Sequence, residues 1–132
     1  MHGRKTRSFT EAFAAHGATP RNVRWSWAAW SDRFDCLVLT VWRDRWVAQE
    51  GVFALPAWHG TGSDERTRLL KRAAIGDQVR IILCEAVDER IEPRALKAQW
   101  ADDRVCYLAD KDDGGGFKVR PTMEVPKVKL AP

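Results

Sequence analysis

Cysteine and histidine are scarce in this chain, which has three of each among its 132 residues. The cysteines are odd in number and lie far apart, each inside an apolar run: Cys36, Cys84 and Cys106. A disulfide framework needs more cysteines at closer spacing, so we expect three buried thiols in strands. The histidines lack the spacing of metal ligands, and no CxxC pair occurs. We therefore expect neither a metal site nor another cofactor.

Long apolar runs are also missing. No stretch approaches the roughly 20 residues that cross a bilayer, and the first residues, MHGRKTRSFTEAF, lack the apolar segment of a secretory signal. The composition is 45% hydrophobic and 30% charged, which is typical of one soluble globular domain. We expect a cytoplasmic protein with no membrane partner.

Catalytic motifs are absent as well. The sequence has no GxSxG, Walker or GxGxxG motif, no HNH or zinc-protease signature, and no acid-x-Lys tripeptide of the kind found in carboxylate nucleases. Glu85, in IILCEAV, is the one acid inside a strongly apolar segment. It is a candidate for a perturbed carboxylate, but a solvent-facing position on a half-exposed strand is the explanation that we favour. The sequence thus favours a non-catalytic protein.

Tryptophan is abundant instead, and it is concentrated in one segment. Five of the seven tryptophans lie between Trp25 and Trp46, with arginines among them. A small core seldom needs so many indoles so close together, and indole with arginine suits stacking against flat groups such as nucleobases. Core packing is the alternative explanation, because tryptophan is highly buried on average.

The basic excess coincides with this tryptophan-rich part. Residues 1–49 hold eight Arg or Lys against four acids, which accounts for the whole net charge of +4, and residues 50–132 hold fourteen of each sign. A positive field there attracts phosphate or another anionic partner. The helix expected later in the chain carries a second basic group that we interpret as a solvated helix face: Arg66, Arg68, Lys71 and Arg72.

Periodicity and turn residues predict the elements of the fold. We expect helices at 8–17 and 64–76, the second capped by Asp64 and ended by Gly76, and strands at 23–31, 36–42, 52–55, 77–87, 104–109 and 117–120. SDRFD is the turn of a hairpin between the first two strands, FKVR pairs with RVCYLA, and ALKAQW is either helical or extended. These elements predict an α+β domain whose mainly antiparallel sheet, of five or six strands, curls into a small open β-barrel beside two helices.

The expected organisation is one domain with two tails. Residues 1–7 form a flexible basic N-terminal arm, residues 8–121 a single globular domain, and residues 122–132, with two prolines, an extended C-terminal tail.

The residue order resembles a known kind of domain. WSWAAWSDRFDCLVLTVWRDRW, followed by ERTRLLKRAAIGDQVRIILCEAVD, EPRALKAQWADDRVCYLA and FKVRP, is similar to a Trp-rich bacterial accessory domain found with HNH-type restriction endonucleases. The resemblance covers about residues 22–121, and WSW and LTVWRD are its most specific parts. It implies a DNA-recognition module, and some small-barrel modules of this kind read modified bases in aromatic pockets. Because the chain has no HNH segment, cleavage is not implied. The resemblance carries a recognition role to Trp25, Trp27, Trp42, Arg43 and Asp44.

The sequence therefore predicts a non-catalytic DNA-binding module that senses a modified or flipped base in bacterial defence or on mobile DNA, with a nuclease or methyltransferase as a further partner. Trp25, Trp27 and Trp42 would stack on bases, Asp44 would bind a base edge, and phosphates would contact Arg24, Arg43 and Arg45. The main alternative is a protein-interaction or regulatory module that docks a partner or a second copy through its tryptophans. A small enzyme with a site around Glu85 and the hairpin is a third hypothesis.

Overall fold

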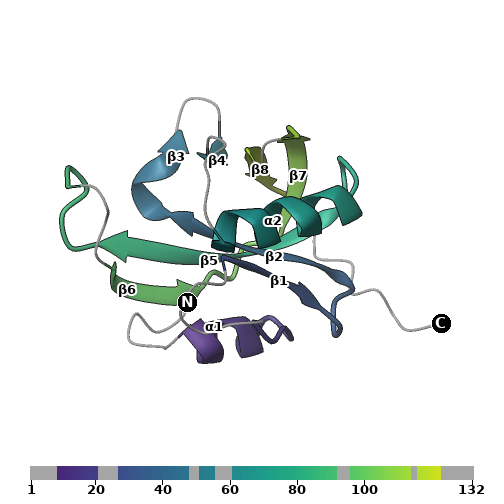
Figure 1. Cartoon of the computed structure of the whole chain (residues 1–132), viewed down its shortest axis with the longest axis horizontal. Coiled ribbons are helices and arrows are strands. Elements are labelled where there is room, and N and C mark those ends of the chain that lie inside the picture. The colour runs from purple at the N-terminus through teal and green to yellow at the C-terminus, as the bar shows by residue number, and fades with distance from the viewer. Residues whose placement is uncertain are drawn as a thin grey trace.

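The structure, a computed structural model, describes residues 9–20, 27–47, 51–55, 61–91, 96–113 and 116–122. The predicted arm at 1–7 and the tail beyond residue 122 lie outside these residues. The helical segments are α1 (Phe9–Ala15), the 3-10 turn η1 (Arg43–Arg45) and α2 (Thr61–Arg72). The strands are β1 (Ala28–Ser31), β2 (Cys36–Trp42), β3 (Trp46–Val47), β4 (Val52–Leu55), β5 (Gln78–Ala86), β6 (Leu96–Ala101), β7 (Cys106–Lys111) and β8 (Phe117–Pro121) (Figure 1).

All eight strands belong to one mixed sheet. Its order is β1-β2-β5-β7-β8-β4-β3, and β6 pairs with β5 beside this path. β2 and β5 run parallel, and the other pairs are antiparallel. The predicted α+β class is confirmed, and the sheet is antiparallel for the most part. A barrel is not confirmed, because in the described part of the chain the sheet ends at β1 and β3 without closing.

The parallel pair follows from the order of the elements in the chain. Parallel neighbours need a long crossover, and here β3, β4 and α2 lie between β2 and β5 in the chain. In Figure 1, α1 lies on one side of the layer of β1, β2, β5 and β6, whereas α2 and the remaining strands lie on the other. The central strands are thus covered on both faces.

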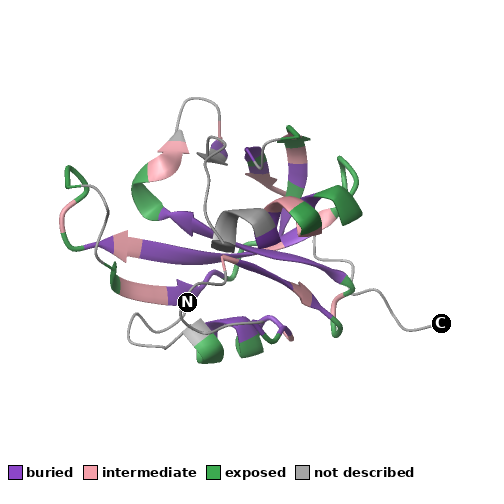
Figure 2. Cartoon of the chain, in the orientation of Figure 1, coloured by how far each residue is buried: buried purple, intermediate pink, exposed green. Residues whose placement is uncertain are grey.

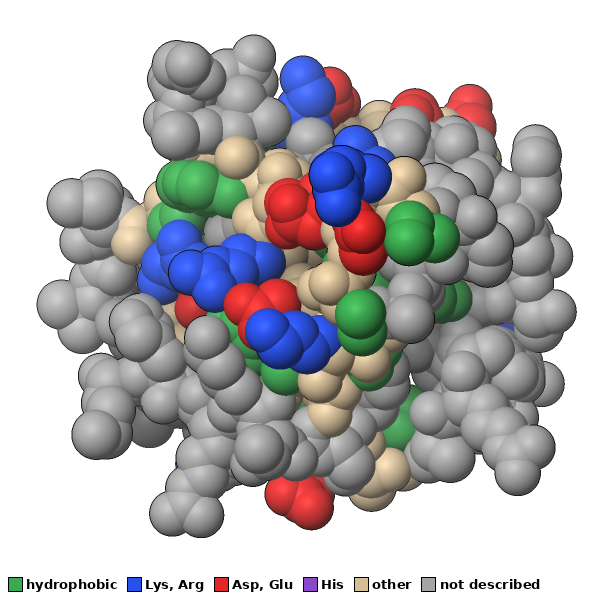
Figure 3. Space-filling view, turned by 90° about the vertical axis from the view of Figure 1, so that its left-hand side faces the viewer, with side chains coloured by type: hydrophobic (Ala, Val, Ile, Leu, Met, Phe, Trp, Pro, Cys, Tyr) green, Lys and Arg blue, Asp and Glu red, His purple; other side chains and the backbone are tan. Residues whose placement is uncertain are grey.

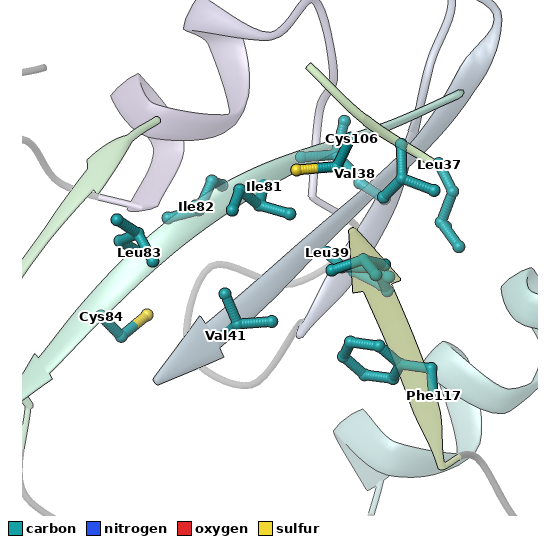
Figure 4. Close-up of a cluster of buried hydrophobic side chains, with 14 of the residues drawn as sticks. Leu37, Val38, Leu39, Val41, Ile81, Ile82, Leu83, Cys84, Cys106 and Phe117 are labelled. Atoms are coloured by element: carbon teal, nitrogen blue, oxygen red, sulfur yellow. The ribbon is translucent and has the colours of Figure 1, made fainter. Parts of the chain in front are cut away.

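The core forms where the layer of β1, β2, β5 and β6 packs against α2 and the remaining strands. Every residue of β2 is buried, and Leu37 and Leu39 are fully inaccessible to solvent. Figure 2 shows the same burial along most of β5, and Figure 4 shows side chains of both strands in the buried cluster that also includes Phe117 of β8. A strand that is buried on both faces loses the in-and-out alternation of a one-sided sheet, which is why β2 reads as a continuous apolar run.

The three cysteines are buried and free, one in each of β2, β5 and β7, as predicted. Burial raises the pKa of the Cys36 thiol to about 11 and that of Cys106 to about 12. It raises the pKa of Cys84 as well. At neutral pH these groups are therefore neutral thiols, which act as small apolar side chains in the core.

The local predictions hold for most elements. The β1–β2 hairpin forms with Ala28 opposite Leu39, and β7 pairs with β8. The ambiguous ALKAQW segment is extended, as β6. The predicted cap is wrong, since α2 begins at Thr61 and Asp64 is its fourth residue. Thr, Ser and Asp are all favoured at helix starts, so this run allows more than one first residue.

α2 is held in place by buried and paired cations. Lys111 Nζ, from β7, donates to the Leu70 carbonyl at 2.7 Å and also to the Ala73 carbonyl at the end of the helix. Arg66 is fully buried, with its guanidinium 5.3 Å from the centre of the Phe117 ring, and burial lowers its pKa to about 10. The predicted solvated helix face is thus wrong for Arg66, while the other three basic residues of that group are exposed.

The end of α1 is attached to two strands. His16 Nε2 donates to the Ile81 carbonyl at 2.8 Å, and Ala18 forms a bridge with Ser31. Between them Gly17 has a φ of +70°, and a Cβ built there would lie 2.5 Å from the Cβ of Arg33. The chain therefore needs glycine at this position, both for its backbone conformation and for its close approach to the β1–β2 turn.

Substitution of Gly17 tests this approach. We expect Gly17→Ala to lower the free energy of unfolding by about 1–3 kcal/mol, because the left-handed φ and the contact with Arg33 both oppose a methyl group. Gly76→Ala is the matched control, since Gly76 has a φ of +97° but no atom within 4 Å of a Cβ. Urea denaturation of both variants measures the difference. Equal losses would show that the turn does not approach Gly17 closely.

The pH dependence of stability tests the His16 contact. Burial lowers the pKa of His16 below its ordinary 6.5, so the unfolded chain binds a proton at a higher pH than the folded one. His16 therefore stabilises the fold above pH 6.5, and that stability is lost as the pH falls from 6.5 through the lower folded pKa. We expect His16→Gln to flatten the fall in unfolding free energy between about pH 7 and pH 5. An unchanged pH profile would contradict the burial of a neutral imidazole.

Candidate nucleic-acid interface

The predicted tryptophans are divided between the core and residues that are not described. Arg24 and Trp25 lie outside the described residues. Trp42 is only 5% exposed, and its ring centre lies 6.2 Å from that of Trp27, with an interplanar angle of 51°. Trp27 is half-buried and packs against the same core cluster. Trp42 thus serves as core packing, the alternative explanation of the cluster, and in this structure it offers no ring face for stacking.

The predicted cationic residues after β2 form the short η1 turn. Arg43 Nη1 donates to Glu85 Oε2 at 2.9 Å, Asp44 is exposed, and Arg45 is half-buried. Glu85 keeps 21% of its side chain exposed, so it is neither a fully solvated nor a deeply buried carboxylate. An exposed ion pair of this kind is worth at most about 1 kcal/mol, but it cancels the charge of Arg43.

The face around η1 is mixed in charge. Figure 3 shows basic and acidic side chains side by side on this face of the molecule, which is the left-hand side of Figure 1. Arg90 adds another pair, with Nε 3.1 Å from Oδ1 of Asp88. A surface where acids accompany the arginines has little net attraction for a polyanion.

A different set of arginines gathers at the opposite end of β2, around the β1–β2 turn. Arg72 of α2 lies over the ring of Trp30, with its guanidinium carbon 3.9 Å from the ring centre. Arg80 of β5 and Arg33 of the turn lie over the ring of Phe34, at 4.0 and 5.0 Å. We call these five residues the arginine–aromatic surface: Trp30, Arg33, Phe34, Arg72 and Arg80.

The arginines of this surface contact aromatic rings, although the exposed acids Asp32 and Asp35 lie in the same turn. None of its three arginines forms an ion pair with a carboxylate in the described part of the chain. Partial burial lowers the pKa of Arg80, and the nearby positive charge of Arg33 lowers it further. One acid of the turn, Asp35, accepts a hydrogen bond from Trp30 Nε1 at 3.2 Å. The arginines are thus oriented by aromatic rings rather than by acids. This leaves the N–H groups of the exposed Arg33 and Arg72 for an external anion, whereas Arg80 is half-buried and its Nε is closed off from solvent.

The turn itself has a defined geometry. The Phe34 amide donates to Ser31 Oγ at 3.0 Å, and Ser31 is fully buried. Asp35 then adopts a φ of +49°, a conformation that Asp tolerates better than most residues. This turn fixes the direction of Arg33 and Phe34 relative to the strands.

A cavity of about 430 Å³ adjoins this surface, between α2 and β1. Its lining residues are Thr19, Ala28, Ala29, Trp30, Asp32, Glu65, Arg68 and Leu69. Glu65 is 5% exposed, and its Oε1 has no hydrogen-bond partner within the described residues. Trp30 belongs to both the cavity and the arginine–aromatic surface, so the two are continuous.

Sequence reasoning missed this site for two reasons. Arg68 and Arg72 belong to the basic group of the expected helix, and because they are one helical turn apart they also share a face of α2. Trp30 belongs to the tryptophan-rich segment. The shared helix face and the tryptophan together indicate the site, whereas each feature alone does not. The position of Arg80 had no such signal, because it lies opposite Val38 through the parallel β2–β5 pairing, which local sequence does not specify.

Two other kinds of site are not found among the described residues. They contain no group of three or more His, Cys, Asp or Glu side chains that could hold a metal ion. No helix within them is long and apolar enough to cross a membrane. Comparison with protein-family models, with curated proteins and with solved structures found no match for the chain. The resemblance to nuclease-associated domains therefore stays a prediction.

The different burial of Trp42 and Trp30 can be tested by comparing the stability of two alanine variants. We expect Trp42→Ala to lower the free energy of unfolding by about 3–5 kcal/mol, because it removes a buried ring from a packed core. Trp30→Ala should cost clearly less, since this ring is only half-buried. Denaturation followed by circular dichroism compares the two. Equal costs would contradict this division between core and surface.

Proposed function

We propose that the chain is a non-catalytic DNA-binding module, and that it contacts the nucleic acid through the arginine–aromatic surface. The observation that carries this proposal is the set of three arginines that lie over aromatic rings without carboxylate partners in the described part of the chain. Phosphate groups fit this arrangement, because a guanidinium held over a ring loses little conformational entropy when it binds an anion.

The proposal moves the contact away from the residues selected from sequence. Arg43 is compensated by Glu85, and Trp42 is buried, so the η1 end supplies less charge and less ring surface. Arg33, Arg72 and Arg80 take the phosphate role in the proposal, and a base contacts Trp30 only on the part of its half-buried ring that Arg72 leaves uncovered. A function in bacterial defence or on mobile DNA, beside a nuclease or methyltransferase, remains part of the proposal and rests on the resemblance alone.

A second candidate function is a protein-interaction module. It is favoured by exposed apolar side chains near the junction of β5 and β6, where Val87 is 65%, Ile91 59% and Leu96 37% exposed. Such residues suit a protein partner or a second copy of the chain. Association through them would be insensitive to salt, whereas binding through arginines weakens steeply with salt.

Salt-dependent titration tests the first candidate. We expect fluorescently labelled DNA, single- or double-stranded, to bind at low salt, with an affinity that falls as salt rises. Arg33→Gln, Arg72→Gln and Arg80→Gln should each reduce the slope of log affinity against log salt by about one. Arg90→Gln is the matched control, because Arg90 is exposed and already paired with Asp88.

Arg43→Gln distinguishes a DNA contact at η1 from one at the arginine–aromatic surface. If this variant changes the salt slope and the three others do not, the DNA contact lies at η1 and the placement proposed here is wrong. If no DNA binds even at low salt, the chain is not a DNA-binding module. Salt-insensitive self-association in light scattering would then favour the interaction module.

A further inference from the structure

The cavity beside Trp30 is lined by a buried acid, Glu65, that lacks a hydrogen-bond partner for one oxygen within the described residues. Glu65 is only 5% exposed to solvent, and no group in the described part of the chain donates a hydrogen bond to its Oε1. Buried polar atoms are nearly always hydrogen-bonded, because an unpaired one costs the free energy of removing it from water. A ligand that brings a donor into the cavity would remove that cost.

The rest of the lining limits what the ligand is. Ala28, Ala29 and Leu69 form apolar walls, and Trp30 adds an aromatic one. These walls suit a flat, partly apolar group rather than a hydrated ion. The cavity volume of about 430 Å³ lies in the range of about 300–1,000 Å³ that is usual for small-molecule sites. A planar group with an N–H edge fits this lining.

Arginine lies on the same side of α2 as this cavity. Arg68 lines it, and Arg72, one helical turn later, covers the Trp30 ring at 3.9 Å. A planar ligand in the cavity would thus lie near a guanidinium that pairs with a phosphate group. An aromatic wall, a carboxylate and a neighbouring arginine together match the three parts of a nucleotide: ring, N–H edge and phosphate.

The carboxylate selects among the bases. A carboxylate only accepts hydrogen bonds, and guanine is the base whose Watson–Crick edge presents two adjacent donors, N1–H and the N2 amino group. Adenine and cytosine place an acceptor nitrogen beside their amino group, which would face the negative charge. Thymine has a single N–H between two carbonyl oxygens. Only guanine therefore pairs with both oxygens of Glu65 without placing an acceptor against them.

We propose that this cavity binds a guanine base, with the N1–H and N2 amino group donating to Glu65 and with Trp30 as the aromatic wall. The inference rests on the proposed DNA-binding function, and it adds the identity of the base. The same chemistry is available from a guanine extruded from a DNA strand and from a free guanine nucleotide. Binding of the strand requires the arginine–aromatic surface as well, because that surface contacts the flanking phosphates.

The experiment compares two oligonucleotides that differ in one amino group. One carries a single guanine in a thymine strand, and the other carries hypoxanthine at the same place, which lacks the N2 amino group. Fluorescence anisotropy with the full chain should show about tenfold tighter binding of the guanine strand, since a site built for a donor discriminates against its loss. Guanosine monophosphate, titrated alone by calorimetry, distinguishes the free nucleotide from the strand.

Glu65→Gln is the decisive variant. It keeps the shape of the side chain and removes the charge and one acceptor, so the preference for guanine over hypoxanthine should fall to about one. The hypoxanthine strand, which donates through N1–H alone, should lose less affinity than the guanine strand. Glu89→Gln is the matched control, because Glu89 is exposed in the β5–β6 connection. Asp32→Asn tests the second, exposed acid of the lining, and we expect it to keep the preference.

A second readout is independent of any ligand. If Glu65 is buried without a donor, Glu65→Gln should raise the melting temperature of the free protein. A lower melting temperature would mean that the carboxylate already has a partner, which overturns the inference. Guanine and hypoxanthine strands that bind equally to the wild type would overturn it too, and would leave DNA binding intact. Failure of every strand to bind would instead overturn the proposed function, and tight binding of the monophosphate alone would identify a free nucleotide as the ligand.

Discussion

The parallel pairing of β2 with β5 is the contact on which the rest of the structure depends. It runs from Leu37 opposite Val79 to Trp42 opposite Cys84, and both strands are buried along most of their length. The same register determines what lies at each end. At one end it brings Arg80 beside the β1–β2 hairpin, and at the other it brings Glu85 within reach of Arg43. The core and both charged surfaces are therefore consequences of one alignment.

The two ends differ in how their charges are held. At the η1 end, Arg43 meets a carboxylate, and the surrounding face carries acids and bases together (Figure 3). At the hairpin end, arginines lie over Trp30 and Phe34, and the one deeply buried acid of the adjoining cavity, Glu65, has no donor for its Oε1 within the described residues. A nucleotide could bind to both kinds of group, with its phosphate at the arginines on the surface and the N–H groups of its base at Glu65 in the cavity.

Much of the local structure could be predicted from sequence, and the long-range pairing could not. The hairpin and β2 follow from turn residues and from a β-branched apolar run, both of which act over a few residues. Whether Trp42 faces the core depends on the layer that covers β2, which comes from distant parts of the chain. The burial of Arg66 has the same origin, since it requires Phe117 of β8 beside α2. The candidate site was missed because it joins a turn, a helix and a strand through that distant pairing.

The most direct test of a nucleic-acid interface at the hairpin end is an amide and indole chemical-shift map, recorded by NMR while a guanine-containing oligonucleotide is added at low salt. The account predicts that the largest changes occur at the Trp30 indole, at residues 32–34 of the turn, and along the last turn of α2 with Arg80. Changes confined to η1 and the β5–β6 connection, with the Trp30 indole unmoved, would contradict it.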